Sequence, residues 1–192
     1  MDARYKLNFK KRRSGKTNYK KRYNLLLSKE PRIVIRITNK QIIIQTVKYN
    51  EKGDETIAQA TSIELKSYGW THAQKNTPSA YLTGLLCAKR SLDKKIKTAI
   101  IDFGLHSTYT KGRIFAAVKG IIDGGIKIAH DTEKDIFPDE KRITGTHLKK
   151  DSTKEFEKVK ENILKMKKEK DTKPKATKKT TAKPPKKDTK KK

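Results

Sequence analysis

The sequence predicts an α/β fold in which a mixed sheet, built in the order β-β-β-α-β-α, is covered by helices. Three short segments rich in Ile and Val follow one another over residues 32–62, separated by turn residues. A helical pattern over residues 78–95 then leads to a fourth apolar run at 98–103, and a second helical pattern covers 113–123. Because strand–helix–strand connections form right-handed crossovers, we expect the fourth strand to lie parallel to one of the first three.

The first three segments predict an antiparallel meander. In the first of them, isoleucines alternate with Val34, Arg36 and Thr38, so one face of this strand is apolar. Short runs of Asn, Lys, Gly and Asp separate the segments and favour tight turns. The predicted strands cover residues 32–38, 41–49 and 55–62. The later apolar run at 98–103 is bounded by Gly104, and we expect it to be a buried central strand.

The helices follow from their capping residues. Thr77 is the expected N-cap of the helix over 78–95, with a loop over residues 66–76 before it. The helix over 113–123 ends at a Gly-Gly pair, and residues 126–148 look irregular.

Residues Ser152 and Glu155 fit a capping box at the start of a C-terminal amphipathic helix. We expect this helix to dock on the domain or on a partner through a narrow apolar stripe. The stripe consists of Phe156, Val159, Ile163 and Met166.

The net charge of +28 is concentrated at the two ends of the chain. Residues 1–30 hold 11 Lys and Arg against 2 Asp and Glu, and residues 149–192 hold 19 against 7. Such ends repel one another unless a polyanion neutralises them, and nucleic acid is the usual partner. We divide the chain into a basic RNA-binding arm and helix (1–30), a globular domain (31–148), a C-terminal amphipathic helix (149–171) and a Lys-rich tail (172–192). The tail has no large apolar residue and is expected to be disordered.

The N-terminal segment has the pattern of an RNA-binding element. Residues 1–16 are expected to form an extended arm, followed by a helix over 17–28 with Thr17 as its N-cap. Cations can neutralise phosphates here, while tyrosines and arginines can stack on unpaired bases. The predicted contacts are Arg4, Tyr5, Lys6, Lys10, Lys11, Arg12, Arg13, Lys16, Tyr19, Lys20, Lys21, Arg22 and Tyr23.

Four cations of the domain, Arg36, Lys48, Lys111 and Arg113, are predicted to extend the RNA-binding surface. The last two flank Gly112 at a helix N-terminus, which can present backbone N–H groups to a phosphate.

Several function classes fit the sequence poorly. No apolar stretch approaches the ~20 residues that cross a bilayer, so we expect no membrane partner. The four histidines are not at metal-ligand spacing, and no P-loop or dinucleotide fingerprint is present. We therefore expect no metal, no cofactor and no small-molecule substrate. The single cysteine, Cys87, has no partner for an intrachain disulfide and is expected in the core, as suits a reducing cytoplasm.

Asp102 supports an alternative reading as a metal-dependent, RNase-H-like nuclease, because two-metal nucleases hold their ions with carboxylates at strand ends. The predicted strands offer it almost no acidic neighbour, so we favour a structural role in which Asp102 accepts hydrogen bonds at the Phe103–Gly104 turn. A generic polyanion-binding protein is a further alternative.

Seven sequence segments together resemble the archaeal form of ribosomal protein L-eighteen. They occur in one order: RYKLNFKKRRSGKTNYKKRYNLLLS (4–28), KYNEKGD (48–54), YGW (68–70), NTPSAYLTGLLCAKRSL (76–92), AIIDFGLH (99–106), KGRIFAAVKGIIDGG (111–125) and FPDEKRITGTHL (137–148). The resemblance implies an RNase-H-like α/β/α sheet without catalytic carboxylates, and therefore no enzyme.

The resemblance also implies a structural component of the large ribosomal subunit in the cytoplasm. Its arm and helix would bind 5S rRNA and attach it to the large-subunit (23S) rRNA in the central protuberance, beside neighbouring large-subunit ribosomal proteins. This role carries over to the cations from Arg4 through Arg22. The chain departs from the family pattern after Leu148, so the resemblance implies nothing about the Lys-rich tail.

Overall fold

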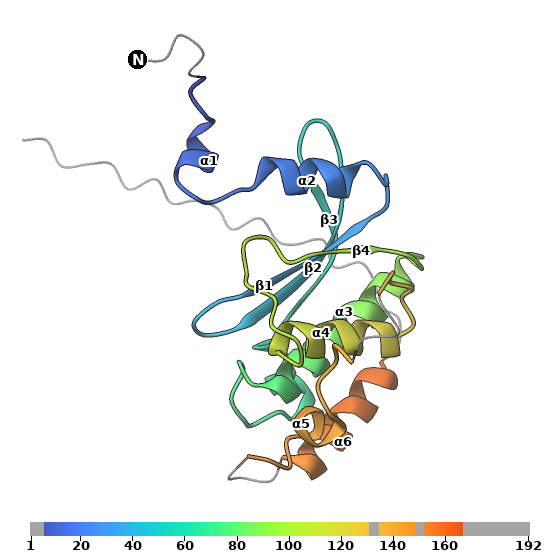
Figure 1. Ribbon diagram of the computed structural model, residues 1–192. Helices are drawn as coiled ribbons and strands as arrows, with labels where there is room; N and C mark the ends of the chain where they lie inside the picture. Colours follow the sequence, from blue (N-terminus) through green and yellow to red (C-terminus); the bar gives the residue numbers. More distant parts are fainter. Residues whose placement is uncertain (1–5, 131–134, 149–151, 167–192) are drawn as a thin grey trace, which may run out of the picture.

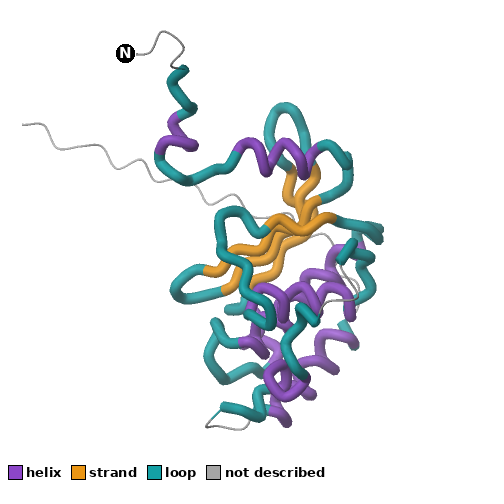
Figure 2. Tube along the Cα trace, in the orientation of Figure 1, coloured by secondary structure: helices purple, strands orange, loops and turns teal. Residues whose placement is uncertain are grey.

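A four-stranded mixed sheet forms the centre of the protein (Figures 1 and 2). The computed structural model describes residues 6–130, 135–148 and 152–166. The strand order is β3-β2-β1-β4, with β1, β2 and β3 antiparallel and β4 parallel to β1. The predicted meander and the parallel fourth strand are thereby confirmed. The strands are β1 (Arg32–Ile37), β2 (Ile42–Lys48), β3 (Glu55–Thr61) and β4 (Ile100–Asp102).

The expectation that the fourth strand is central was wrong, because β4 lies at the edge of the sheet. Ile100 and Ile101 are only half-buried. A single parallel bridge joins Thr98 to Lys127, and the neighbouring Ile126 is buried. The apolar residues of 98–103 are therefore covered by the segment after α4, and β4 does not have a strand on each side.

Two helices, α3 (Thr77–Asp93) and α4 (Arg113–Asp123), pack on one face of the sheet (Figure 1). They cover a row of fully buried isoleucines from β1 and β2, namely Ile33, Ile35, Ile42 and Ile44. Asn76 is the N-cap of α3 rather than Thr77, and its side chain accepts a hydrogen bond from the backbone N–H of Ser79 at 2.9 Å.

The two helices approach each other closely because glycines lie at their crossing. A Cβ on Gly84 would overlap the carbonyl oxygen of Ala117, and a Cβ on Gly120 would overlap that of Tyr81. Cys87 lies in the same core, is fully buried and is unpaired, as expected.

Three elements differ from the predicted loops and caps. The expected loop over 66–76 is preceded and partly occupied by the 3-10 helix η1 (Glu64–Tyr68), and the expected irregular segment contains α5 (Glu140–Thr144). The predicted capping box of α6 (Thr153–Leu164) does not form. Instead, the hydroxyl of Ser152 donates to the carbonyl of Thr144 at 3.1 Å.

Helix α6 docks on α3, as its apolar stripe predicted. Phe156, Val159 and Ile163 are buried in the main core, and Met166 packs against it. The carboxylate of Glu155 accepts hydrogen bonds from the hydroxyl and the N–H of Thr71. These bonds hold the pKa of Glu155 below its usual value.

The N-terminal segment contains two short helices, α1 (Lys10–Arg13) and α2 (Tyr19–Leu26). The expected extended arm is therefore interrupted by one helical turn. Asn18, not Thr17, caps α2 by accepting from the N–H of Lys21 at 3.1 Å. No helix of the described ranges combines the length and apolarity needed to span a bilayer. The predicted Lys-rich tail lies outside the described residues.

Candidate nucleic-acid interface

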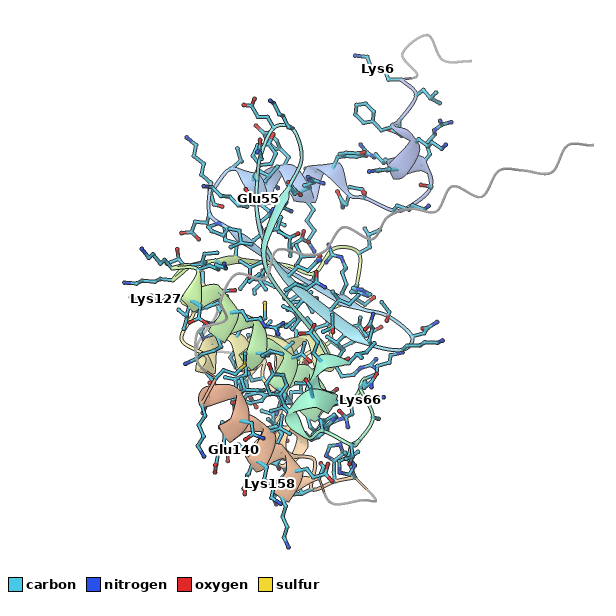
Figure 3. The ribbon with its side chains drawn as sticks, turned by 180° about the vertical axis from the view of Figure 1, so that it is seen from behind. Lys6, Glu55, Lys66, Lys127, Glu140 and Lys158 are labelled. Atoms are coloured by element: carbon cyan, nitrogen blue, oxygen red, sulfur yellow. The ribbon has the colours of Figure 1, made fainter. Side chains whose placement is uncertain are left out.

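The described part of the basic segment, residues 6–30 with α1 and α2, is called the arm from here on. Its N-terminal end at Lys6 lies far from the sheet, whereas α2 crosses beside the start of β3 at Glu55 (Figure 3). No residue of α1 or α2 is buried. The ring of Phe9 lies 5.3 Å from that of Tyr19, centroid to centroid, and so connects the two helices. The arm thus presents its side chains to solvent, as a polyanion-binding segment must.

Most of the arm residues predicted to bind RNA are exposed. Tyr19, beside Phe9, and Arg22 are half-buried. Arg4 and Tyr5 lie outside the described residues. The exposed members of the set are Lys6, Lys10, Lys11, Arg12, Arg13, Lys16, Lys20, Lys21 and Tyr23.

Two cations of α2 are bound to the domain. The Lys21 ammonium donates to the carbonyl of Gly104 at 3.3 Å. The Arg22 guanidinium donates to Asp54 Oδ2 at 2.8 Å. Arg22 thus fastens α2 to the β2–β3 turn, and Lys21 fastens it to the turn that follows β4.

Behind Asp54 lies a buried charge network that sequence reasoning missed. The Arg32 side chain is only 3 % exposed and donates to Asp54 Oδ2 at 2.7 Å and to Asp102 Oδ2 at 3.2 Å. Asp102 also lies 3.6 Å from the Arg36 guanidinium. A signal was present, because two arginines interrupt an otherwise apolar strand and need anionic partners when they are buried.

Arg36 is mainly a structural residue. Its Nη1 donates to the carbonyl oxygens of Ile35 and Asp102, both at 2.9 Å, and its guanidinium lies against Gly104. The side chain is still 37 % exposed. Lys48, at the end of β2, is exposed.

A cleft of about 280 Å³ separates α2 from the sheet face opposite α3 and α4. Its positively charged lining comes from the arm and the sheet together. The basic side chains around it are Lys16, Lys21, Arg22, Arg32 and Arg36. Asp54 and Asp102 also line the cleft, and their carboxylates neutralise the buried Arg32. Because the basic side chains outnumber the acidic ones, the cleft keeps a net positive charge.

Lys111 and Arg113 do lie together at the N-terminus of α4, but Lys111 pairs with carboxylates whereas Arg113 donates to a backbone carbonyl. The Lys111 ammonium lies 2.6 Å from Asp135 and 3.4 Å from Asp139. The hydrogen bond and attraction to Asp135 raise the pKa of Lys111, and its charge is balanced within the protein. Arg113 donates to the carbonyl of Lys75 at 3.2 Å and is exposed.

The environment of Asp102 is that of a structural carboxylate. Its Oδ1 accepts from the N–H of Gly104 at 2.7 Å, which confirms the predicted role at this turn. Its other oxygen faces Arg32 and Arg36, whose positive charges oppose the binding of a divalent cation. Within the described residues, no three His, Cys, Asp or Glu side chains form a group that could hold a metal ion.

Comparison with known proteins agrees with this geometry. A family model described as "Ribosomal large subunit proteins 60S L5, and 50S L18" matches residues 3–99 and 93–131. A protein of Korarchaeum cryptofilum named large ribosomal subunit protein uL18 is 47% identical over 146 residues, covering 76% of this chain and 74% of its own. The uL18 protein of Methanothrix thermoacetophila is 42% identical over 165 residues, covering 84% and 96%.

The matched residues include the exposed basic arm, the meander, β4 and α4. Another archaeal uL18, from Thermofilum pendens, is 45% identical over 146 residues, with 76% of this chain and 74% of its own covered. The family match over residues 3–131, together with identity of 42–47% over most of the chain, shows that the chain belongs to the family of ribosomal large-subunit proteins that comprises 60S L5 and 50S L18.

Proposed function

We propose that this protein is a structural, non-enzymatic component of the large ribosomal subunit that binds 5S rRNA and attaches it to the large-subunit rRNA. The observation that carries the proposal is the basic arm, because none of the side chains of its helices α1 and α2 is buried in the core. The names of its archaeal relatives, large ribosomal subunit protein uL18, support the ribosomal role. The protein then acts in the cytoplasmic ribosome, next to neighbouring large-subunit proteins.

The RNA-binding surface has two parts in this proposal. The cations and tyrosines predicted within residues 4–23 contact phosphates and unpaired bases. The cleft between α2 and the sheet continues this surface through Arg36, and Lys48 and Arg113 extend it. Lys111 contributes least, because Asp135 and Asp139 already balance its charge.

The mixed sheet with helices α3 and α4 on one face and α2 across the other is compatible with an RNase-H-like arrangement, which we propose as the fold type. We also propose that residues 31–148 form the scaffold, residues 1–30 the RNA-binding part and residues 149–171 a helical extension. Residues 172–192 then supply additional counter-charge for RNA.

Competition binding tests the proposal. Labelled 5S rRNA is bound to the full chain at ~0.3 M salt, which weakens non-specific electrostatic binding. Unlabelled 5S rRNA should displace the label at a much lower concentration than an unrelated structured RNA of equal length. Equal displacement by both RNAs would instead indicate a generic polyanion-binding protein.

A further inference from the structure

We propose that Asp54 is a positioning residue for RNA binding: although it is an anion in a basic surface, it strengthens binding because it fixes the orientation of α2. This inference rests on the proposed function, since it concerns how the same surface is assembled. It assigns a role to a carboxylate that charge alone would count as unfavourable for binding a polyanion.

The contacts of Asp54 connect the arm to the sheet through one atom. Its Oδ2 accepts from Arg22 of α2 at 2.8 Å and from Arg32 of β1 at 2.7 Å. The Asp54 side chain is 25 % exposed, and Arg32 is 3 % exposed. Charge-assisted bonds of this length in a partly buried site are stronger than those between freely exposed ions.

The sheet side of this connection is held firmly. Arg32 also donates to Asp102, and Asp102 in turn accepts from the N–H of Gly104. Gly104 provides the second attachment of the arm, because its carbonyl accepts from Lys21 at 3.3 Å. Both attachments of α2 therefore end on the same network.

Helix α2 depends on these polar contacts because it has little apolar packing. None of its residues is buried, and Tyr23 is 63% exposed. The β2–β3 turn, which carries Asp54, stands beside α2 in both views of the chain (Figures 1 and 3). Without Asp54, the arm keeps its cations but populates orientations that do not match the RNA, which lowers the apparent affinity.

The sign of the effect makes the test sharp. If Asp54 acted only as a charge, Asp54→Asn would strengthen RNA binding by removing repulsion of the phosphates. The proposal predicts the opposite, a loss of about fivefold in affinity for 5S rRNA. Glu51→Gln is the matched control: Glu51 is an exposed anion in the same turn, and its removal should leave affinity unchanged or raise it.

The experiment measures 5S rRNA affinity for the full-length wild type, Asp54→Asn, Asp54→Glu and Glu51→Gln at one salt concentration. Asp54→Glu keeps an acceptor within reach of Arg22 and should recover part of the loss. A further measurement reports on α2 without RNA: a nitroxide on Asn24→Cys, an exposed site of α2, should become more mobile in the Asp54→Asn background. Cys87 is buried and does not compete for the label.

The outcomes separate the two proposals. Failure of the wild type to prefer 5S rRNA overturns the proposed function itself. With that preference intact, equal or tighter binding by Asp54→Asn overturns the positioning role. If Asp54→Asn unfolds, the spin-label spectrum and the RNA affinity of Asp54→Glu are used instead. In that variant, a fivefold loss of affinity for 5S rRNA without any change in label mobility would also overturn the positioning role of Asp54.

Discussion

Arg32 of β1 and Asp102 of β4 form an ion pair across the parallel strands, 3.2 Å from Nη1 to Oδ2, with both side chains largely buried. The same carboxylate accepts from Gly104 N–H, so it holds the end of β4 and the following turn together. The residue that most suggested catalysis therefore stabilises the sheet.

Asp102→Asn should destabilise the protein by about 3 kcal/mol, because a buried arginine loses one of its two carboxylate partners. Urea unfolding followed by circular dichroism measures the change, with the exposed substitution Glu51→Gln as control. A loss below about 0.5 kcal/mol would contradict the structural role of this ion pair.

Replacing Lys10, Lys11, Arg12 and Arg13 by Ala should weaken RNA binding and reduce the salt dependence of the affinity. Each lost phosphate contact removes about 0.7–0.9 from the slope of log K against log salt, so the four residues can remove up to ~4 units. Thermal unfolding should not change, since α1 has no buried residue. An unchanged slope would place α1 outside the interface.

Gly84→Ala should destabilise the protein although alanine is the better helix former. Alanine gains about 1 kcal/mol in helix propensity, but its Cβ would meet the Ala117 carbonyl of α4. Forcing the helices apart costs about 3 kcal/mol, so a net loss is expected in urea unfolding. Asn24→Ala on exposed α2 is the control and should change stability by less than about 0.5 kcal/mol.

The stability should depend on pH through Tyr81. Burial, and then the hydrogen bond that its hydroxyl donates to Asp123 at 2.7 Å, raise the pKa of Tyr81 above its usual value of 10.0. The folded protein thus holds this proton more tightly than the unfolded chain, so the stabilisation is complete below about pH 10 and is lost as the pH rises further. Wild type should lose more stability than Tyr81→Phe between about pH 8 and pH 11 in urea titrations. Equal losses would show that Tyr81 does not contribute.

Deleting residues 172–192 should leave the melting temperature unchanged. The residues of the described hydrophobic core lie between Ile33 and Ile163, so the deletion removes none of them. The deletion should nevertheless lower RNA affinity at low salt, because ten lysines are removed. A drop of several degrees in calorimetry would show that the segment packs on the domain.

Short-range patterns were sufficient to predict most of the secondary structure. The alternating isoleucines located β1, and the apolar spacing with the Gly-Gly pair gave α4 its observed bounds. The N-caps predicted for α2 and α3 were each wrong by one residue, because two residues of cap type stand side by side, as with Asn76 and Thr77. Only the backbone conformation decides between them.

The features that escaped prediction depend on residues far apart in the chain. The partner of Arg36 is 66 positions away and that of Arg22 is 32 positions away. Charge density located the arm correctly as an exposed segment. It could not distinguish cations that face solvent from those already matched by a carboxylate, such as Lys111.

Because no residue of α1 or α2 is buried, selection for folding and selection for recognition act on different residues of this chain. Substitutions in the arm can alter what the protein recognises without bringing the core near its unfolding threshold, provided that Arg22 is retained. Under the proposed function, variation in this segment is therefore limited by the shape of the RNA that it binds rather than by the need to fold.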